Sequence, residues 1–473
     1  MKTINKLLKF NKKKGGTLSK KDSNKVKRQY SGVGELKSPQ NGRSEAGSPV
    51  HKVTVQDLLK PSPTFQETPQ NGRVRLFIEK LRLCCVMFDW SKDGAHTQTD
   101  TRGIEVKRQL LLELVDFVGK NKAVFSEHVV VEIMKMVRIN LFRNLPPKVH
   151  ANMIDPEEEE PVFEAAWPHL QIVYEFFLRF IVSGDLDVRL MRKFITMDFV
   201  NNLLDLFDSE DPRERDYLKT ILHRIYAKFM MLRAFIRKSI NITFYNFIYN
   251  TERHNGVAEL LEILGSIING FALPLKEEHK QFFKTALIPM HKVKPLYVFH
   301  RQLSYCVTQF VDKDHTLATD AILGLLKYWP VLNSSKELLF LNEMEEILEL
   351  TQPEEFETIY RHLFKRIGMA IGSPHFQIAE RALFFWHNEY ISSLIADYRK
   401  EILPIIFPAL HVNSQTHWNQ TVSTLTLNVL KIFVDIDSNL VEECSRYYES
   451  EVPKKESMVK YRKDRWLMLE SKT

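Results

Sequence analysis

From Arg73 onward the sequence is a continuous succession of amphipathic segments, and this pattern constrains the fold more than any other feature. The segments are roughly 12 to 28 residues long, with apolar side chains three and four positions apart. Short breaks separate them, and many breaks contain proline, for example Pro146, Pro212, Pro330 and Pro374. The strict alternation of apolar and polar residues that strands require is hard to find, and only 17 of 473 residues are glycine. The sequence therefore predicts an all-α protein.

Pairs of these segments make units of roughly 40 to 50 residues, which is the size of HEAT and armadillo repeats. About eight such units fit into residues 73–452. The alternative is one globular helical bundle, but this length of chain exceeds the size at which a single core usually stops growing. We therefore predict a curved α-solenoid of about eight HEAT-like repeats.

The two ends of the chain differ in composition from the repeats. Residues 1–72 are rich first in lysine and then in serine and proline, so they predict a disordered tail. The lysine cluster favours nuclear targeting or attraction to acidic lipid or nucleic acid, or it is simply a solvated tail. Residues 453–473 form a basic segment ending near Trp466, and we expect it to be partly disordered, either as a frayed helix or as a contact for a partner.

The motifs that mark common catalytic or metal sites are absent from the sequence. It contains no phosphate-binding P-loop, no H-E-x-x-H helix, no G-x-S-x-G turn and no EF-hand loop. The four cysteines have neither zinc-ligand spacing nor a disulfide framework, which indicates a reducing compartment. We therefore expect a protein that is not an enzyme, holds no metal or cofactor of its own, and binds partners.

Membrane and secretory segments are not expected either. The sequence has no apolar run of about 18 uncharged residues, and its lysine-rich first residues do not supply the apolar part of a secretory signal. We therefore expect a cytoplasmic protein without a transmembrane segment, with the nucleus as a second location.

The most informative helix is expected to begin at Asp211 and to continue beyond Ile236. Asp211 as N-cap, Pro212 at the first helical position and Glu214 three residues after the cap predict a capping box. Apolar residues then recur three and four positions apart on one helix face, which we expect to be buried: Leu218, Leu222, Ile225, Phe229, Leu232 and Ile236.

A second stripe on the same helix carries cations and an aromatic ring. At about 100° per residue it lies roughly a quarter turn from the apolar stripe and consists of Lys219, His223, Tyr226, Met230, Arg233 and Arg237. The pattern predicts a surface for docking a partner and not a catalytic centre.

The following helix completes the predicted site. Ile263 and Ile267 lie one turn apart, and Lys276, His279 and Lys280 follow the break at Pro274. If the two helices are neighbours, they form an apolar slot edged with cations, suited to an extended peptide with aliphatic anchors and an acidic or phosphorylated end. The alternative is that Arg233 and Arg237 pair with acids such as Glu259 or Glu262 on adjoining helices.

An acidic run lies between two prolines at Asp155–Pro161. Its carboxylates can face a cationic or metal-bearing site on a partner, or they can form a solvated loop that leads into the next helix. The acidic residues are Asp155, Glu157, Glu158, Glu159 and Glu160.

Several long runs of the sequence resemble the B-prime family of regulatory subunits of protein phosphatase 2A. The resemblance covers roughly residues 73–450, and it is most specific in Glu164–Glu175, Leu206–Arg215, His223–Tyr226, Asn255–Lys280, Ser373–Leu383 and Thr416–Asn419. It implies a HEAT-like solenoid that joins a scaffold subunit and a catalytic subunit in a heterotrimer and selects substrates without hydrolysing them. The metals of the reaction would then belong to the catalytic subunit.

The resemblance also implies roles for individual residues. Family members bind short Leu-x-x-Ile-x-Glu motifs, and by position Tyr226 and Arg233 would surround the leucine. His223, Ile263 and Ile267 would surround the isoleucine, while Lys276 and His279 would meet the terminal acid. Thr220 and Arg237 would lie at the edge, and the acidic run Asp155–Pro161 would face the catalytic subunit.

Two other functions stay open at this point. A helical-repeat adaptor of the nuclear-transport type, unrelated to a phosphatase, would use the same solenoid and charged stripe to bind cargo peptides. Binding of nucleic acid would use the N-terminal lysines, but nothing in the repeats requires it, so we do not expect it.

Overall fold

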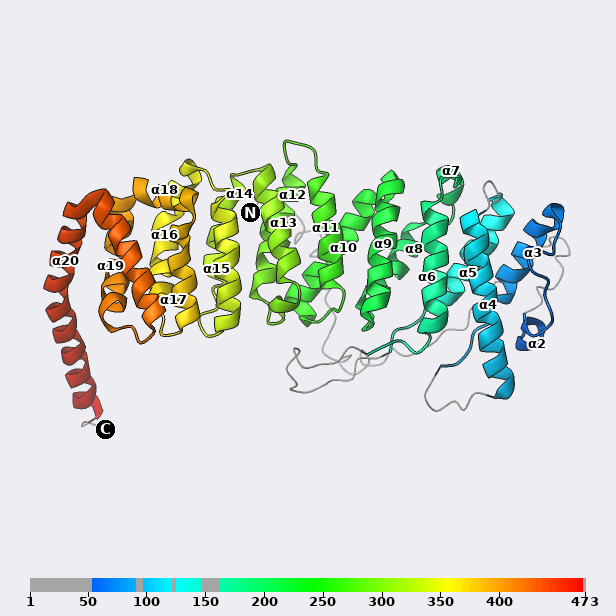
Figure 1. The fold of residues 1–473 in the computed structure, drawn as a ribbon, viewed down its shortest axis with the longest axis horizontal. Coiled ribbons are helices and arrows are strands. Elements are labelled where there is room, and N and C mark those ends of the chain that lie inside the picture. The colour runs from blue at the N-terminus through cyan, green and yellow to red at the C-terminus, as the bar shows by residue number, and fades with distance from the viewer. Residues whose placement is uncertain (1–52, 91–96, 121–124, 147–161, 471–473) are drawn as a thin grey trace, which may run out of the picture. The chain divides into compact units, whose positions relative to one another are not determined.

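A computed structural model describes residues 53–90, 97–120, 125–146 and 162–470, and every regular element in these residues is a helix (Figure 1). The first half contains α2 (Val55–Leu58), α3 (Gln70–Leu83), α4 (Gln98–Lys120), α5 (Glu127–Leu141), α6 (Trp167–Val182), α7 (Val188–Met191), α8 (Met197–Asp205), η1 (Leu206–Asp208), α9 (Pro212–Lys228), η2 (Met230–Leu232), α10 (Arg233–Asn246), η3 (Phe247–Thr251) and α11 (Val257–Asn269).

The second half continues in the same way. It contains α12 (Glu277–Phe282), η4 (Phe283–Leu287), η5 (Ile288–Lys292), η6 (Leu296–Val298), α13 (His300–Lys313), α14 (Leu317–Lys327), α15 (Ser334–Leu348), α16 (Pro353–Ile371), α17 (Phe376–Leu383), η7 (Phe384–His387), α18 (Glu389–Asp397), α19 (Arg399–Thr416) and α20 (Gln420–Glu470). No helix in the described part of the chain is both long enough and apolar enough to cross a membrane.

The helices of residues 53–470 pack in two layers. In the first layer each helix contacts the next one in the order α4, α6, α9, α11, α13, α15, α17 and α20. The second layer includes α3 against α5, α8 against α10, and α14 against α16, which contacts α19. Neighbours along the chain, such as α14 with α15 and α16 with α17, connect the layers. The first layer supplies one helix per repeat, which confirms the predicted solenoid of about eight helical repeats.

One continuous core lies between the layers. It extends from Leu58 to Cys444 and takes in the apolar face of every long helix up to that point. The predicted apolar stripe of α9 belongs to it, because Leu218, Leu222 and Ile225 are fully buried. Each repeat therefore buries its apolar face against its neighbours and not within itself.

The described structure begins before the predicted boundary at residue 73. Thr54 and Asp57 form a capping box at the start of α2, with Thr54 N donating to Asp57 Oδ2 over 3.0 Å. Leu58 of α2 is buried in the core, although it lies in a segment rich in serine and proline. Val55 and Phe65 also pack against the core, so a few apolar residues anchor this segment, and composition did not indicate it.

The C-terminal segment is helical over its described part. Residues 453–470 belong to α20, which is compatible with the helix considered for this segment, and its partial disorder stays a prediction. Within α20 the chain bends at Asp437, whose φ and ψ are −154° and 82°. Asp437 Oδ1 accepts from Leu440 N over 3.1 Å, so this side chain caps the second part of α20.

Candidate functional site

The start of α9 is fixed by a cap of a different kind from the predicted one. Asp211 is the N-cap, but its carboxylate accepts from Arg213 N over 2.9 Å, at the second helical position. Glu214 does not reach back to the cap, so the predicted capping box is wrong. Its side chain is fully buried and instead contacts Arg143 and Tyr174. This carboxylate pairs with a half-buried cation that follows α5 instead of with the local backbone.

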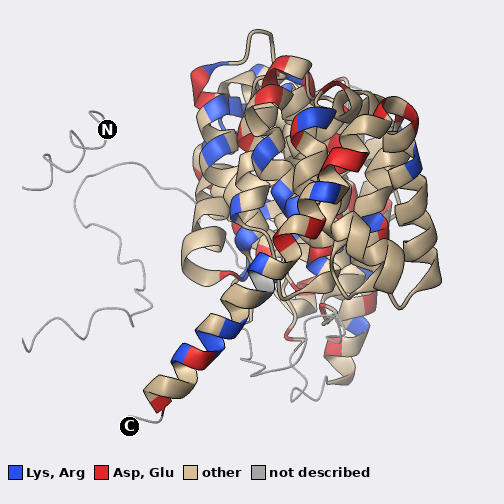
Figure 2. Ribbon diagram, turned by 90° about the vertical axis from the view of Figure 1, so that its left-hand side faces the viewer, with Lys and Arg blue, Asp and Glu red and all other residues tan. Residues whose placement is uncertain are grey.

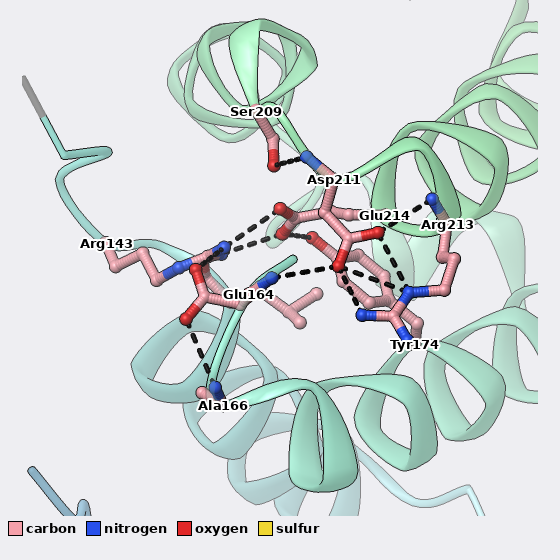
Figure 3. A network of polar contacts seen from close by, with 9 residues as sticks. Arg143, Glu164, Ala166, Tyr174, Ser209, Asp211, Arg213 and Glu214 are labelled. Atoms are coloured by element: carbon pink, nitrogen blue, oxygen red, sulfur yellow. Dashed lines mark hydrogen bonds and ion pairs between the residues drawn. The ribbon is translucent and has the colours of Figure 1, made fainter. Parts of the chain in front are cut away.

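Figure 3 shows the polar network that results. Arg143 donates two parallel hydrogen bonds to Glu214, of 2.7 and 2.8 Å, and a third of 2.8 Å to Glu164. Tyr174 Oη donates to Glu214 over 2.7 Å, and burial raises the pKa of Tyr174 well above its usual range. Glu164 N donates to Asp211 over 3.0 Å. The network therefore joins the end of α5 and the start of α6 to the first turn of α9, and fixes the register of that helix.

The predicted single helix through Ile236 is wrong, because α9 ends at Lys228. Phe229 leaves helical geometry with φ −109° and ψ 80°, the short helix η2 follows, and α10 begins at Arg233. The ring of Phe229 is buried in the core. α9 lies in the first layer and contacts α11, whereas α10 contacts α8 in the second layer. The chain must turn between layers here, and the sequence has neither glycine nor proline to announce the turn.

This turn brings together three residues of the predicted site. Arg233 donates to the carbonyl oxygens of Tyr226 and Ala227, each over 3.0 Å, so its guanidinium caps the last turn of α9. The same guanidinium carbon lies 5.3 Å from the centre of the Tyr226 ring. Arg237 donates to Tyr226 Oη over 3.0 Å. The aromatic ring is therefore held between two cations.

The alternative pairing of these arginines with Glu259 or Glu262 is wrong. Glu259 accepts from Arg215 over 2.9 Å, and Glu262 accepts from Lys219 over 2.7 Å. Arg233 and Arg237 form no ion pair with a carboxylate anywhere in the described ranges.

α11 lies beside α9, as the predicted site requires. His223 Nε2 of α9 is 2.9 Å from Ser266 Oγ of α11. Burial lowers the pKa of His223, and the charge of Arg224 contributes. Thr220 Oγ1 donates to Asp216 O over 3.1 Å within α9, so its proton is used inside the helix. The contact with Ser266 places His223 on the seam between the two helices, whereas the hydrogen bond of Thr220 lies within α9.

Ile263 and Ile267 are more covered than the predicted slot requires. They are 2% and 5% exposed, respectively, and belong to the core on α11. In this structure they form the floor beneath the seam, while Ser266 between them is exposed.

The remaining cations gather after the break at Pro274. Lys276 is the exposed N-cap residue of α12, and the ring of His279 stacks on Phe271 with 3.9 Å between centres and 12° between planes. Burial lowers the pKa of His279; Glu278 opposes this shift, and the charges of Arg237 and Lys276 add to it. The positive charges of Arg237 and Lys276 therefore both reach His279, although Arg237 belongs to α10 and Lys276 caps α12. Lys280 is paired with Asp314 at 2.7 Å and is not available in the same way.

Some residues of this region were not predicted, and one predicted group cannot be placed. Ser266 and Phe271 hold the two histidines, and the only sequence signal for them is their position beside the predicted residues. The acidic residues Asp155, Glu157, Glu158, Glu159 and Glu160 lie outside the described residues, so their location stays a prediction.

The chemistry of the site is that of binding. Tyr226, Arg233, Arg237, Lys276 and His279 offer hydrogen-bond donors, positive charge and one aromatic face, which suit an acidic peptide. Within the described residues no group of three or more His, Cys, Asp or Glu side chains is placed to hold a metal ion. Fold and site together define a helical-repeat protein with a basic and aromatic surface at the end of α9.

Comparison with known proteins agrees with this class and makes it specific. A family model described as "Protein phosphatase 2A regulatory B subunit (B56 family)" matches residues 62–473. The chain therefore belongs to the B56 family of protein phosphatase 2A regulatory proteins, the B-prime family that the sequence resembles. Membership in this family places the chain among regulatory subunits and not among catalytic ones.

Individual relatives are similar over most of their length. The B' beta isoform of the 57 kDa regulatory subunit from Arabidopsis thaliana is 55% identical over 87% of this chain and 82% of its own. The delta isoform of the human 56 kDa regulatory subunit is 52% identical over 87% of this chain and 68% of its own. The mouse alpha isoform is 50% identical over 92% and 88%. A crystal structure of an engineered protein covers 84% of this chain and 97% of its own at 11% identity, but its TM-score of 0.35 is too low to add to the description of the fold.

Proposed function

We propose that this chain is the non-catalytic regulatory subunit of a protein phosphatase 2A heterotrimer and recruits substrates that carry Leu-x-x-Ile-x-Glu motifs. Membership in the family supports the regulatory role. The observation that carries the motif proposal is the convergence of Arg237, Lys276 and His279 beside Tyr226 and Arg233, where the two arginines have no carboxylate partner in the described residues.

The order of side chains along the seam suits such a motif. Tyr226 and the stem of Arg233 offer an aromatic and aliphatic surface for the leucine. The seam at His223 and Ser266, above Ile263 and Ile267, would receive the isoleucine. The terminal glutamate would meet the cations Lys276 and His279, with Arg237 close by.

Recruitment would act by raising local concentration. A motif bound with a Kd of about 1 μM, on a flexible linker, brings its substrate to an effective concentration of about 1 mM near a phosphatase site. The chain itself would need no catalytic group, and the metals of the reaction would be those of the catalytic subunit.

The partners of this function would be a scaffold subunit, a catalytic subunit and substrate proteins with short acidic or phosphorylated motifs. We propose no role for nucleic acid. We also propose a cytoplasmic location with access to the nucleus, which imaging of a fluorescent fusion in living cells would test.

The proposed function is tested by isolating the chain from cell extract and measuring the phosphatase activity that accompanies it. We expect okadaic-acid-sensitive activity to co-purify, and a free Leu-x-x-Ile-x-Glu peptide to displace substrates while the phosphatase stays bound. A preparation without phosphatase would contradict the regulatory role.

The site is tested by peptide affinity, measured with a fluorescent motif peptide and the full chain. Arg233→Ala or His223→Ala should weaken binding at least about tenfold, because each removes a charged or hydrogen-bonding group from the seam. Lys238→Ala is the matched control, since Lys238 is an exposed cation next to Arg237 on α10. Unchanged affinity in the first two variants would exclude this assignment, provided that their circular dichroism is unaltered.

A further inference from the structure

The last part of α20 lies outside the continuous core of the described residues. Cys444 is the last residue of the continuous core, and all described side chains from Ser457 to Glu470 are exposed. In Figures 1 and 2 this part of the helix extends away from the neighbouring helices. An isolated helix of this length is only marginally stable in water, so packing against a partner would stabilise it.

This part of the helix is rich in large, exposed apolar side chains. Five of them are between 54% and 67% exposed: Met458, Val459, Tyr461, Trp466 and Leu467. Single exposed apolar residues are common on protein surfaces, but several of them within three turns are typical of an interaction surface. Trp and Tyr are also the residues that most often dominate binding energy.

These side chains do not form one stripe. At about 100° per residue, Val459 and Trp466 share one face, since they are seven residues apart. Met458 and Tyr461 share a second face about 120° away, and Leu467 lies on a third. A flat surface, such as a lipid bilayer or the side of another solenoid, can reach only one of these faces. A partner that closes around the helix can reach all three.

The charge of the segment identifies the kind of partner. Residues 454–465 contain six basic and two acidic side chains: Lys454, Lys455, Lys460, Arg462, Lys463 and Arg465, with Glu456 and Asp464. A second copy of the same segment would be repelled by this excess of positive charge. An acidic partner would be attracted to it.

We propose that residues 454–467 are a docking helix for an acidic protein whose apolar groove encloses a helix, the chemistry of a Ca²⁺-loaded EF-hand sensor. Such sensors expose a methionine-rich groove when Ca²⁺ binds, and they take up basic helices with aromatic anchors. Trp466 is the main anchor of this interaction, and the lysines and arginines on both sides of Tyr461 contact the acidic rim. This inference is independent of the peptide site on α9 and α11.

The experiment uses the full chain and Ca²⁺-loaded calmodulin as the probe, with isothermal titration calorimetry as the readout. We expect binding in Ca²⁺ that is lost in excess chelator, because the groove closes without the ion. Trp466→Ala should weaken the affinity at least about tenfold. Replacing Lys460 and Lys463 together by glutamate should weaken it by a similar factor and remove most of its dependence on salt.

Tyr447→Ala is the matched control, because Tyr447 is an equally exposed aromatic residue on α20 that precedes the docking helix. All variants should keep the thermal midpoint of the unaltered chain, since the substituted side chains lie outside the core. Absence of Ca²⁺-dependent binding would overturn the proposal. So would binding that survives Trp466→Ala, or binding to vesicles containing phosphatidylserine in place of calmodulin, which would identify a lipid surface as the partner.

Discussion

At the scale of single residues, the most demanding group in the core is Glu343, which is fully buried between two histidines. Its oxygens lie 2.9 Å from His291 Nε2 and 2.8 Å from His300 Nε2. Burial alone would raise the pKa of Glu343, but the charge and hydrogen bonds of His291 and His300 outweigh it and lower the pKa to about 2. His291 Nδ1 must donate to Ile288 O, 2.8 Å away, because a carbonyl only accepts. His291 therefore connects the backbone of Ile288 to the carboxylate of Glu343 through its two ring nitrogens.

These contacts predict different results for two substitutions. Glu343→Ala leaves the buried ring nitrogens of His291 and His300 without their partner and should lower the free energy of unfolding by about 1–3 kcal/mol for each unpaired group. Glu343→Gln should lower it less, because the amide can donate to one histidine and accept from the other. Denaturation midpoints in urea would measure both.

The same pair of variants contains its own control. Equal destabilisation by alanine and glutamine would mean that a neutral hydrogen-bonding group cannot replace the carboxylate. The contribution of Glu343 to the free energy of unfolding should be lost only in acid. Folding lowers the pKa of Glu343, so this contribution is fully present above about pH 4.3 and disappears as the pH falls toward about 2.

The proposed peptide site also contains a titrating residue, His279. Burial lowers the pKa of His279 in the free chain, with contributions from Arg237 and Lys276 against that of Glu278. A bound carboxylate would favour the charged imidazolium and raise this pKa, so binding would take up a proton. The affinity for a motif peptide should therefore increase as the pH falls from about 8 to about 6.

Peptide affinity measured across this pH range would test the prediction. His279→Gln should flatten the dependence, although a smaller part should remain because burial also lowers the pKa of His223. A peptide ending in glutamine in place of glutamate is the control, and it should show a weaker dependence. An affinity that is equal at all pH values would exclude contact between the acid and His279.

At the scale of elements, helix α9 shows how a local pattern and distant contacts share control of one helix. Its apolar face and its N-cap follow from residues near in sequence, and both were predicted. The ion pair of Glu214 depends on Arg143, which follows α5. The break at Phe229 depends on the second layer, where the next helix packs. The network around Arg143 is the clearest case, because Arg143 and Glu214 are separated by 71 positions.

Removing Arg143 should therefore weaken a whole junction between elements. Arg143→Ala leaves Glu214 buried without a cation and should lower the free energy of unfolding by about 3–5 kcal/mol. Adding Glu214→Gln should recover part of this loss, since a neutral amide is less costly to bury. Denaturation of the single and double variants would measure the coupling.

The control for Arg143 is Arg75, whose ion pair with Glu79 on α3 is largely exposed. Arg75→Ala should not change the denaturation midpoint measurably, because exposed ion pairs contribute little. A double variant that is no more stable than Arg143→Ala would show that Glu214 does not depend on its charge partner.

At the scale of the whole described chain, the continuity of the core explains why the residues that stabilise the fold differ from those proposed to bind partners. Every repeat is held by its neighbours through contacts between layers, so no repeat needs a catalytic or metal centre to fold. The proposed peptide site on α9–α12 and the proposed docking helix at the end of α20 lie on different parts of the surface. A protein built this way can connect several partners at once, which suits a regulatory role.

The sequence by itself determined the helical class, the succession of repeats, the buried stripe at Leu218, Leu222 and Ile225, and the cap at Asp211. These features depend on periodicity and on residues a few positions apart, so they can be read locally. Its resemblance to a family also named the residues of the peptide site.

Only the tertiary structure decided how those residues meet. It ended α9 at Lys228, so Arg233 caps α9 from the next helix instead of continuing a stripe, and it buried Ile263 and Ile267 beneath the seam. It also paired Glu259 with Arg215 and Glu262 with Lys219. Arg233 and Arg237 therefore have no carboxylate partner in the described residues. Turns between layers and pairings of charges depend on contacts between distant parts of the chain, and periodicity carries no information about them.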